Sequence, residues 1–200
     1  MDEIRLGKIF ALPRAASLDA WDYAWNTAAS GFLDKGLKSG FWNSIKILVP
    51  SLAMSVAVSS VCGYALACWR VKGGNLLLSA LLLCAFIPFQ IIMVPIVGLS
   101  TDLKLGNVWG IIPMYWGLGA PLAVFMYHGF VKGVPRELEE AAAIDGAGQF
   151  FVFFRVVLPL LKPITATILI LDALWLWNDF LLPLSVVKAG TLQLAQLKFY

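Results

Sequence analysis

Long apolar intervals separated by short charged ones dominate the pattern of this sequence. The intervals 47–69, 73–101 and 105–131 contain no Asp, Glu, Lys or Arg. Each exceeds the roughly 20 residues that a helix needs to cross about 30 Å of hydrocarbon. A fourth apolar run, 163–187, is interrupted only near its middle and end. The pattern is typical of a chain that crosses a membrane several times.

Four spans are therefore predicted, over about 45–69, 75–100, 108–130 and 163–185. All four should be helical, because a single segment in lipid must satisfy its backbone hydrogen bonds internally. Prolines and glycines crowd the second and third spans, so these helices are expected to be kinked or locally unwound. The residues concerned are Pro88, Pro95, Pro113, Gly117, Gly119 and Pro121.

Composition excludes a water-soluble fold. Hydrophobic residues make up 60% of the 200 residues, charged residues 14%, and the mean hydropathy is +0.82. The formal net charge is only +3, with no Lys/Arg tract among aromatics, so nothing indicates a nucleic-acid partner. The three cysteines, Cys62, Cys68 and Cys84, have neither metal-ligand nor disulfide spacing.

Charged residues between the spans predict the orientation. The loops that follow the first and third spans carry a concentration of Lys and Arg, which is typical of the cytoplasmic side. These residues are Arg70, Lys72, Lys132, Arg136, Arg155 and Lys162. Residues 1–43 are then predicted to be an external segment outside the membrane, residues 44–200 the membrane domain, and residues about 131–162 a cytoplasmic loop.

That loop begins with a short acidic and alanine-rich helix. Pro135 suits a first helical turn, and three glutamates place negative charge at the positive end of the helix. Three alanines follow, whose small side chains let a partner approach closely. Gly146 and Gly148 are predicted to end the helix. The aromatic stretch 150–157 then indicates a helix lying along the membrane surface.

The loop resembles the EAA motif of ABC importer permeases, which reads E-A-A, three residues, Gly, nine residues, Ile-x-Leu-Pro. Here Glu140-Ala141-Ala142 is followed by Gly146 and by Val156-x-Leu158-Pro159, with valine in place of isoleucine. The stretches G-Y-A-L-A at 63–67, I-P at 87–88, L-E-E-A-A-x-I-D-G around position 145, and W-N-D-F-L-L-P-L at 177–184 resemble the carbohydrate, or maltose-type, branch of that family.

This resemblance implies an all-α, polytopic bundle of the type I ABC importer permease kind. The family usually has six spans, and the four predicted here match the second to the fifth, so the chain is expected to be truncated at both ends. The resemblance also implies a multi-pass protein of a bacterial or archaeal inner membrane. Its function would be to form the translocation pathway of an ATP-driven importer, with sugars as the expected solutes.

Partners and cofactors follow from the same resemblance. They are two ATP-binding subunits, a second homologous permease, an external solute-binding protein and the lipid bilayer. ATP and Mg would be used by the ATPase partner, and no cofactor or metal by this chain. No G-x-x-x-x-G-K-[ST], H-E-x-x-H or G-x-S-x-G motif occurs, so no enzymatic activity is predicted.

Two sets of residues are candidates for function. The predicted ATPase-docking set is Glu140, Ala141, Ala142, Asp145, Gly146, Leu158 and Pro159. A possible solute pathway involves a carboxylate inside the last span and a polar aromatic cluster near its external end. These residues are Asp172, Trp175, Trp177, Asn178 and Asp179. The alternative for the cluster is an interfacial aromatic belt.

Three rival functions remain open at this point. The importer could carry peptides, amino acids or ions, because solute selectivity in such systems rests largely on the external binding protein. A secondary carrier or channel would need ion-coordinating groups in broken helices, for which Gln90 and Asp172 are the only candidates. A membrane-embedded enzyme would need a nucleophile or an acid–base pair, and no such arrangement is apparent.

Overall fold

A computed structural model describes residues 18–27, 36–69 and 71–186, which form helices joined by short turns. In chain order the helices are α2 (Asp19–Asn26), α3 (Leu37–Cys68), α4 (Gly74–Ala85), α5 (Phe89–Asp102), α6 (Val108–Val131), α7 (Glu137–Ile144), α8 (Gln149–Val152), the π-helical turn η1 (Phe153–Val157), α9 (Leu158–Leu160), α10 (Lys162–Asn178) and α11 (Leu181–Val186). The predicted all-α fold is confirmed.

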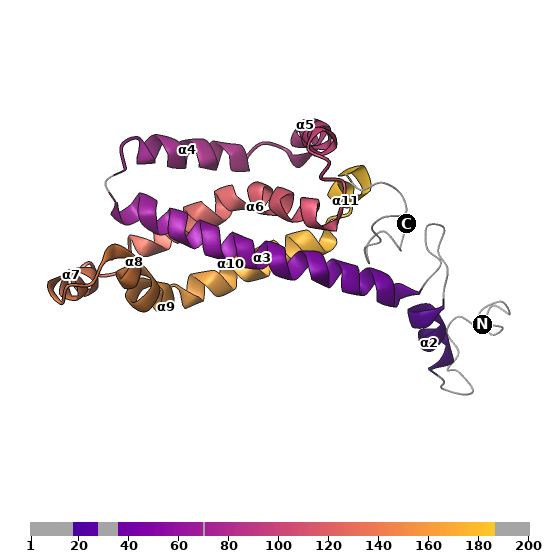
Figure 1. Ribbon diagram of the computed structural model, residues 1–200, viewed down its shortest axis with the longest axis horizontal. Coiled ribbons are helices and arrows are strands. Elements are labelled where there is room, and N and C mark those ends of the chain that lie inside the picture. The colour runs from indigo at the N-terminus through magenta and orange to yellow at the C-terminus, as the bar shows by residue number, and fades with distance from the viewer. Residues whose placement is uncertain (1–17, 28–35, 70, 187–200) are drawn as a thin grey trace, which may run out of the picture.

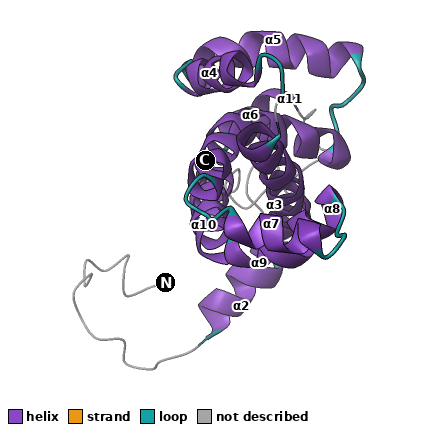
Figure 2. Ribbon diagram, turned by 90° about the vertical axis from the view of Figure 1, so that its left-hand side faces the viewer, coloured by secondary structure: helices purple, strands orange, loops and turns teal. Residues whose placement is uncertain are grey.

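The long helices α3, α6 and α10 run side by side, and α4 lies along one flank of this group (Figure 1). Viewed from the end that carries α7, α4 and α5 lie to one side of the bundle (Figure 2). The turn after α3 and the segment α7–α9 share that end, whereas α2, α5 and α11 lie at the other (Figure 1). The two basic loops, which follow α3 and α6, therefore lie at the same end of the bundle, as the sequence predicted.

Three of the four predicted spans coincide with described helices, namely α3, the bent pair α4–α5, and α6. The fourth, 163–185, is divided between α10 and α11, because the helix is interrupted at residues 179–180. Helices α3 and α6 are each long and apolar enough to cross a membrane. Helices α4 and α5 meet at 102°, and the segment 149–160 meets α10 at 73°. With its 17 residues, α10 is about 25 Å long.

Proline acts differently in these helices than the sequence suggested. The chain bends at Pro88, which precedes α5, but Pro95 lies inside α5 without ending it. Helix α6 continues through Pro113 and Pro121, so the expected unwinding of the third span is wrong. Neighbouring helices compensate for backbone groups that proline leaves unpaired.

A row of small residues on α3 is buried along the bundle: Gly40, Ser44, Ser51, Ser55, Ser59 and Gly63. At Gly63 the packing is tight, because an added Cβ would lie 2.6 Å from the Cβ of Tyr127 and 2.9 Å from the backbone nitrogen of His128. Among the residues that the structure describes, the hydroxyls of Ser51 and Ser59 have no hydrogen-bond partner. At these two positions small size is what the serine contributes, because small residues let two helix backbones approach closely in lipid.

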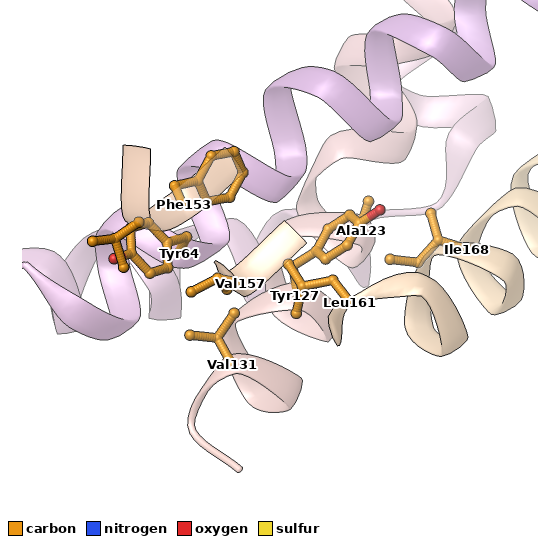
Figure 3. Packing of buried hydrophobic residues seen from close by; sticks show 9 residues of the cluster. Tyr64, Ala123, Tyr127, Val131, Phe153, Val157, Leu161 and Ile168 are labelled. Atoms are coloured by element: carbon orange, nitrogen blue, oxygen red, sulfur yellow. The ribbon is translucent and has the colours of Figure 1, made fainter. Parts of the chain in front are cut away.

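Buried apolar side chains form two clusters, one towards each end of the bundle. The cluster next to α7 joins α3, α6, η1 and α10 (Figure 3). Its buried members are Tyr64, Ala123, Tyr127, Val131, Val152, Phe153, Val157, Leu161 and Ile168. The second cluster joins α3 and α6 to α10 and α11 at the opposite end. The first cluster is the platform on which α7 rests.

The predicted external segment 1–43 lies mostly outside the described residues, which omit 1–17 and 28–35. Within it, α2 stacks Trp21 on Trp25, with ring centroids 6.0 Å apart. Helix α3 already begins at Leu37, inside that segment. Residues 187–200 at the end of the predicted membrane domain are also outside the description.

Candidate docking helix and polar cavity

Helix α7 begins at Glu137, so that Pro135 lies just before the helix and not in its first turn, where the sequence predicted it. The backbone N–H of Leu138 donates to the carbonyl of Pro135 at 3.4 Å, and that of Glu140 donates to Arg136 at 3.0 Å. Glu137, Glu139 and Glu140 occupy its first turn. Carboxylates at this end are favoured by the partial positive charge of the helix N-terminus.

Helix α7 ends in a Schellman motif. The backbone N–H of Gly146 donates to the carbonyl of Ala143, and that of Ala147 donates to Ala142, both at 3.0 Å. Gly146 has a φ of +82°, the left-handed conformation that this motif requires. A Cβ at Gly146 would meet nothing within 4 Å. The backbone conformation, and not lack of space, therefore selects glycine at this position.

Gly148 has a different role from the one the sequence predicted. Its φ of −71° and ψ of 158° are extended, and it precedes α8 as an N-cap residue. Any residue adopts these angles. The helix is thus ended at Gly146 alone, and the prediction that both glycines end it is wrong for Gly148.

The two faces of α7 differ in their contacts. Glu140, Ala141 and Ile144 are exposed on the outer face, and the Ile144 side chain is 87% exposed. Ala142 packs on the apolar cluster that contains Tyr64. The outer face of α7 thus combines an exposed isoleucine with small and acidic side chains.

Glu139 faces the bundle, unlike its two neighbouring glutamates. Its Oε2 accepts a hydrogen bond from the Tyr64 hydroxyl at 3.2 Å, and its Oε1 accepts one from the Cys68 thiol at 3.4 Å. Both donors belong to the last turns of α3. A polar contact therefore joins α7 to the longest helix of the chain.

The segment after α7 has one buried and one exposed face. Val152, Phe153 and Val157 are buried, whereas Phe150 is 65% and Phe154 is 56% exposed. This two-sided pattern fits the predicted membrane-surface helix. The segment includes the π-helical turn η1, which the sequence did not predict.

The predicted docking set falls into two groups in the structure. Glu140, Ala141, Asp145, Gly146 and Pro159 are exposed. The other two members, Ala142 and Leu158, are half-buried against the apolar cluster under α7. These two contribute to holding α7 in place and are not part of the exposed face.

A second polar feature lies inside the bundle. Asp172 on α10 is only 8% exposed, and its Oδ2 accepts a hydrogen bond from the Ser55 hydroxyl of α3 at 2.7 Å. This carboxyl group therefore faces protein, inside the bundle. Gly119 of α6 lies beside it, since an added Cβ would be 3.6 Å from Oδ1 of Asp172.

Asp172 borders a cavity of about 480 Å³ between α10, α6 and the bend that joins α4 to α5. The aromatic side chains of Phe86, Phe89 and Trp175 contribute to its walls. Trp175 meets Phe89 edge-on, with ring centroids 6.4 Å apart. A cavity with aromatic walls and one carboxyl group is a suitable site for a small polar solute.

The remaining residues of the predicted pathway do not line this cavity. Asp179 accepts hydrogen bonds from the Tyr115 hydroxyl at 2.9 Å and from the backbone N–H of Leu181 at 3.1 Å. Trp177 packs on Phe41, with ring centroids 5.9 Å apart. Asn178 is exposed and donates to the carbonyl of Leu174. These three residues organise the end of α10 instead.

Sequence reasoning missed Ile144, Glu139 and Ser55. Helical spacing was a usable signal for Ile144, because it follows Glu140 by four residues and so shares its face. No comparable signal existed for the other two, whose partners are 75 and 117 residues away along the chain. Among the described residues, no group of three or more His, Cys, Asp or Glu could hold a metal ion.

Comparison with known proteins gives a consistent result. The family model described as binding-protein-dependent transport system inner membrane component matches residues 39–198. The multiple sugar-binding transport system permease protein MsmG of Streptococcus mutans is 38% identical over 186 residues, which are 92% of this chain and 64% of that protein.

A second relative is the probable starch degradation products transport system permease protein AmyC of Thermoanaerobacterium thermosulfurigenes. It is 36% identical over 191 residues, covering 95% of this chain and 67% of that protein. The chain therefore spans about two thirds of the length of these relatives.

A solved structure shares the fold. It is that of a bacterial ABC transporter involved in the import of the acidic polysaccharide alginate, with a TM-score of 0.81 and 22% identity. The match covers 99% of this chain and 67% of that chain. The helix arrangement described above is thus one that occurs in an experimentally determined transporter.

Proposed function

Because the chain belongs to the family of binding-protein-dependent transport system inner membrane components, we propose that it is the permease subunit of an ATP-driven sugar importer. The resemblance seen in the sequence is confirmed by this membership. As a member, the chain is a multi-pass inner-membrane protein, and its family and relatives are transport permeases rather than enzymes. The transport activity, the identity of the solute and the partner subunits go beyond this membership and are what we propose.

The observation that carries the proposal is the geometry of α7. A short helix ends in a Schellman motif, is held at one end of the bundle by the contacts of Glu139 and Ala142, and presents Glu140, Ala141 and Ile144 outward. A cleft in an ATP-hydrolysing subunit would receive this face. Ile144 would fill an apolar part of the cleft, and Glu140 would meet a cationic group.

The proposed assembly contains two ATP-binding subunits, a second homologous permease and an external solute-binding protein. ATP and Mg would be bound by the ATPase partners. Closure of the two ATPase subunits would move α7 as a rigid body and rock the bundle between inward-facing and outward-facing states. A rigid connection matters because a flexible one would absorb the displacement.

The cavity beside Asp172 is the proposed part of the solute pathway in this chain. Its carboxyl group would accept hydrogen bonds from solute hydroxyls, and the ring of Trp175 would contact sugar C–H groups. Both residues belong to the set expected from the sequence. Support for sugars comes from these walls and from the names of the relatives, which mention sugars and starch degradation products.

Co-purification of the full-length permease with its ATPase subunit tests the docking proposal. Glu140→Lys and Gly146→Arg should each abolish retention of the ATPase, because one reverses a contact charge and the other strains the end of α7. Gly148→Arg is the matched control, since its extended backbone accepts any residue. Equal retention by all four proteins would contradict the proposal.

Uptake into liposomes by the complete transporter tests the pathway. Asp172→Ala should reduce uptake of the sugar while leaving the ATPase bound. Asn178→Ala, at an exposed position outside the cavity, should leave uptake unchanged. Transport by the permease without its ATPase would instead indicate a secondary carrier or channel. Uptake of a peptide, amino acid or ion in place of sugar would identify another cargo class.

A further inference from the structure

The three glutamates in the first turn of α7 are not equivalent. Glu137 and Glu140 are exposed, whereas Glu139 is half-buried and turned towards α3. Each of its carboxylate oxygens has its own donor, the Tyr64 hydroxyl and the Cys68 thiol. These donors are four residues apart on one face of α3. A carboxylate held at two points resists rotation more than one held at a single point.

Tyr64 itself is firmly placed. Its side chain is 3% exposed, and its ring contacts those of Phe153 and Trp69 at centroid distances of 5.1 and 6.2 Å. Figure 3 shows Tyr64 and Phe153 side by side at the edge of the apolar cluster. The hydroxyl that contacts Glu139 is therefore presented from a ring that has little freedom to move.

The connection continues beyond α3. Gly63, next to Tyr64, lies where α3 approaches the backbone of α6 so closely that an added Cβ would be 2.9 Å from the nitrogen of His128. A displacement of α7 that reached Tyr64 would thus be passed to α3 and from there to α6. The apolar contact of Ala142 also holds α7 on the bundle. That contact is not directional, so it resists a sideways shift of α7 less than the hydrogen bonds of Glu139 do.

We propose that Glu139 is a positioning residue, which fastens the inner face of α7 to α3 through Tyr64 and Cys68 so that the two helices move as one body. The role rests on the proposed function of α7 as the docking helix. Glu140 on the outer face meets the partner, and Glu139 on the inner face transmits the resulting movement. Loss of Glu139 should therefore uncouple ATP hydrolysis from transport without releasing the ATPase.

The first test measures the contact itself and needs no ATP. In the complete transporter, Cys62→Ser and Cys84→Ser leave Cys68 as the only one of the three cysteines of this chain. Glu139→Ala should raise the rate at which a maleimide alkylates Cys68 about fivefold, as expected for the loss of about 1 kcal/mol of hydrogen bonding. Glu137→Ala, which alters an exposed carboxylate on the same helix, should leave that rate unchanged.

The second test measures the number of solute molecules transported per ATP hydrolysed. Tyr64→Phe keeps the ring and removes only the hydroxyl, and Glu139→Gln keeps one acceptor oxygen, so each should lower the ratio moderately. Glu139→Ala should lower it most. The double variant Tyr64→Phe/Glu139→Ala should be no worse than Glu139→Ala, because both changes remove the same contact.

The outcomes separate this inference from the proposed function. Unchanged alkylation and an unchanged transport ratio in Glu139→Ala would overturn the positioning role, even if Glu140→Lys still releases the ATPase. Release of the ATPase by Glu139→Ala would also overturn it, because Glu139 would then belong to the docking face. If Glu139→Ala speeds alkylation of Cys68 but Glu140→Lys still retains the ATPase, the contact between Glu139 and α3 would be supported. The proposed docking role of α7 would then be contradicted.

Discussion

Helices α3 and α6 are held together closely, whereas α4 and α5 are attached to the same bundle loosely. A row of glycine and serine residues brings α3 against α6 until no Cβ fits at Gly63. Helix α4 has no buried residue, and Leu76, Leu77 and Leu83 are all more than half exposed. Both pairs are strongly apolar, so hydrophobicity does not explain the difference.

Side-chain size explains it. In lipid, apolar side chains gain little by leaving the acyl chains for another helix, so association depends on close packing. The small residues of α3 permit that packing, and the leucines of α4 prevent it. The α3–α6 pair is therefore the rigid part of the molecule, and the α4–α5 pair presents an apolar surface to lipid or to another subunit.

The largest expected effect comes from filling the close contact between α3 and α6 at Gly63. Gly63→Leu should destabilise the chain by about 3 kcal/mol, because the new side chain must displace the backbone of α6. The temperature at which the detergent-purified transporter loses its gel-filtration peak measures the change. Gly98→Leu in α5 is the matched control, since a Cβ there meets nothing within 4 Å. A similar loss of thermal stability in both variants would mean that close packing at Gly63 does not distinguish α3 from α5.

A smaller effect is expected within the same row. Ser59 is fully buried, and its hydroxyl has no hydrogen-bond partner within the described part of the chain. Ser59→Leu should cost about 1–2 kcal/mol through overpacking, whereas Ser59→Ala should change stability by no more than about 0.5 kcal/mol. The same thermal assay distinguishes them. A large loss in the alanine variant would mean that the hydroxyl, not its size, holds the helices together.

The smallest effect is expected on the flank. Leu76 is 77% exposed, so Leu76→Ala should alter stability by less than about 0.5 kcal/mol. A substantial loss in the assembled transporter, absent when this chain is purified alone, would show that another subunit covers α4. That result would show that α4 and α5 form a subunit interface, in contrast to α3 and α6, which pack against each other within the chain.

The sequence was sufficient for features that depend on neighbouring residues. The acidic first turn of α7 and its end at Gly146 follow from local rules, and the structure has both. The positions of the apolar runs follow from length and hydropathy. The exposure of Glu140 agrees with the general preference of charged residues for the surface, but that preference does not show which of the neighbouring glutamates turns inward, as Glu139 does.

Pairings between distant helices were out of reach. The contacts Ser55–Asp172 and Tyr64–Glu139 depend on how each helix is rotated about its axis. In a soluble helix an apolar stripe marks the buried face, but in a membrane helix the lipid-facing side is apolar as well. Helix α6 therefore shows no hydrophobic side from which its orientation could be deduced.

Proline gave an ambiguous signal for a similar reason. Pro88 stands at a sharp bend, yet Pro113 and Pro121 lie within a continuous helix. The residue type is the same, and the result depends on whether adjacent helices support the backbone. The roles of Trp177 and Asp179 were likewise decided by contacts with Phe41 and Tyr115, which no local pattern predicts.

The π-helical turn η1 has a consequence for insertions and deletions in this family. A π-helical turn contains one residue more than the α-helical turn it replaces, and one residue corresponds to about 100° of rotation. The nine residues between Gly146 and Val156 include most of η1. Because η1 already contains the extra residue, deleting one residue from this stretch would convert it to an α-helical turn and leave Val157 facing the core, whereas inserting one more would turn Val157 away. This part of the motif should therefore tolerate a one-residue deletion better than a one-residue insertion.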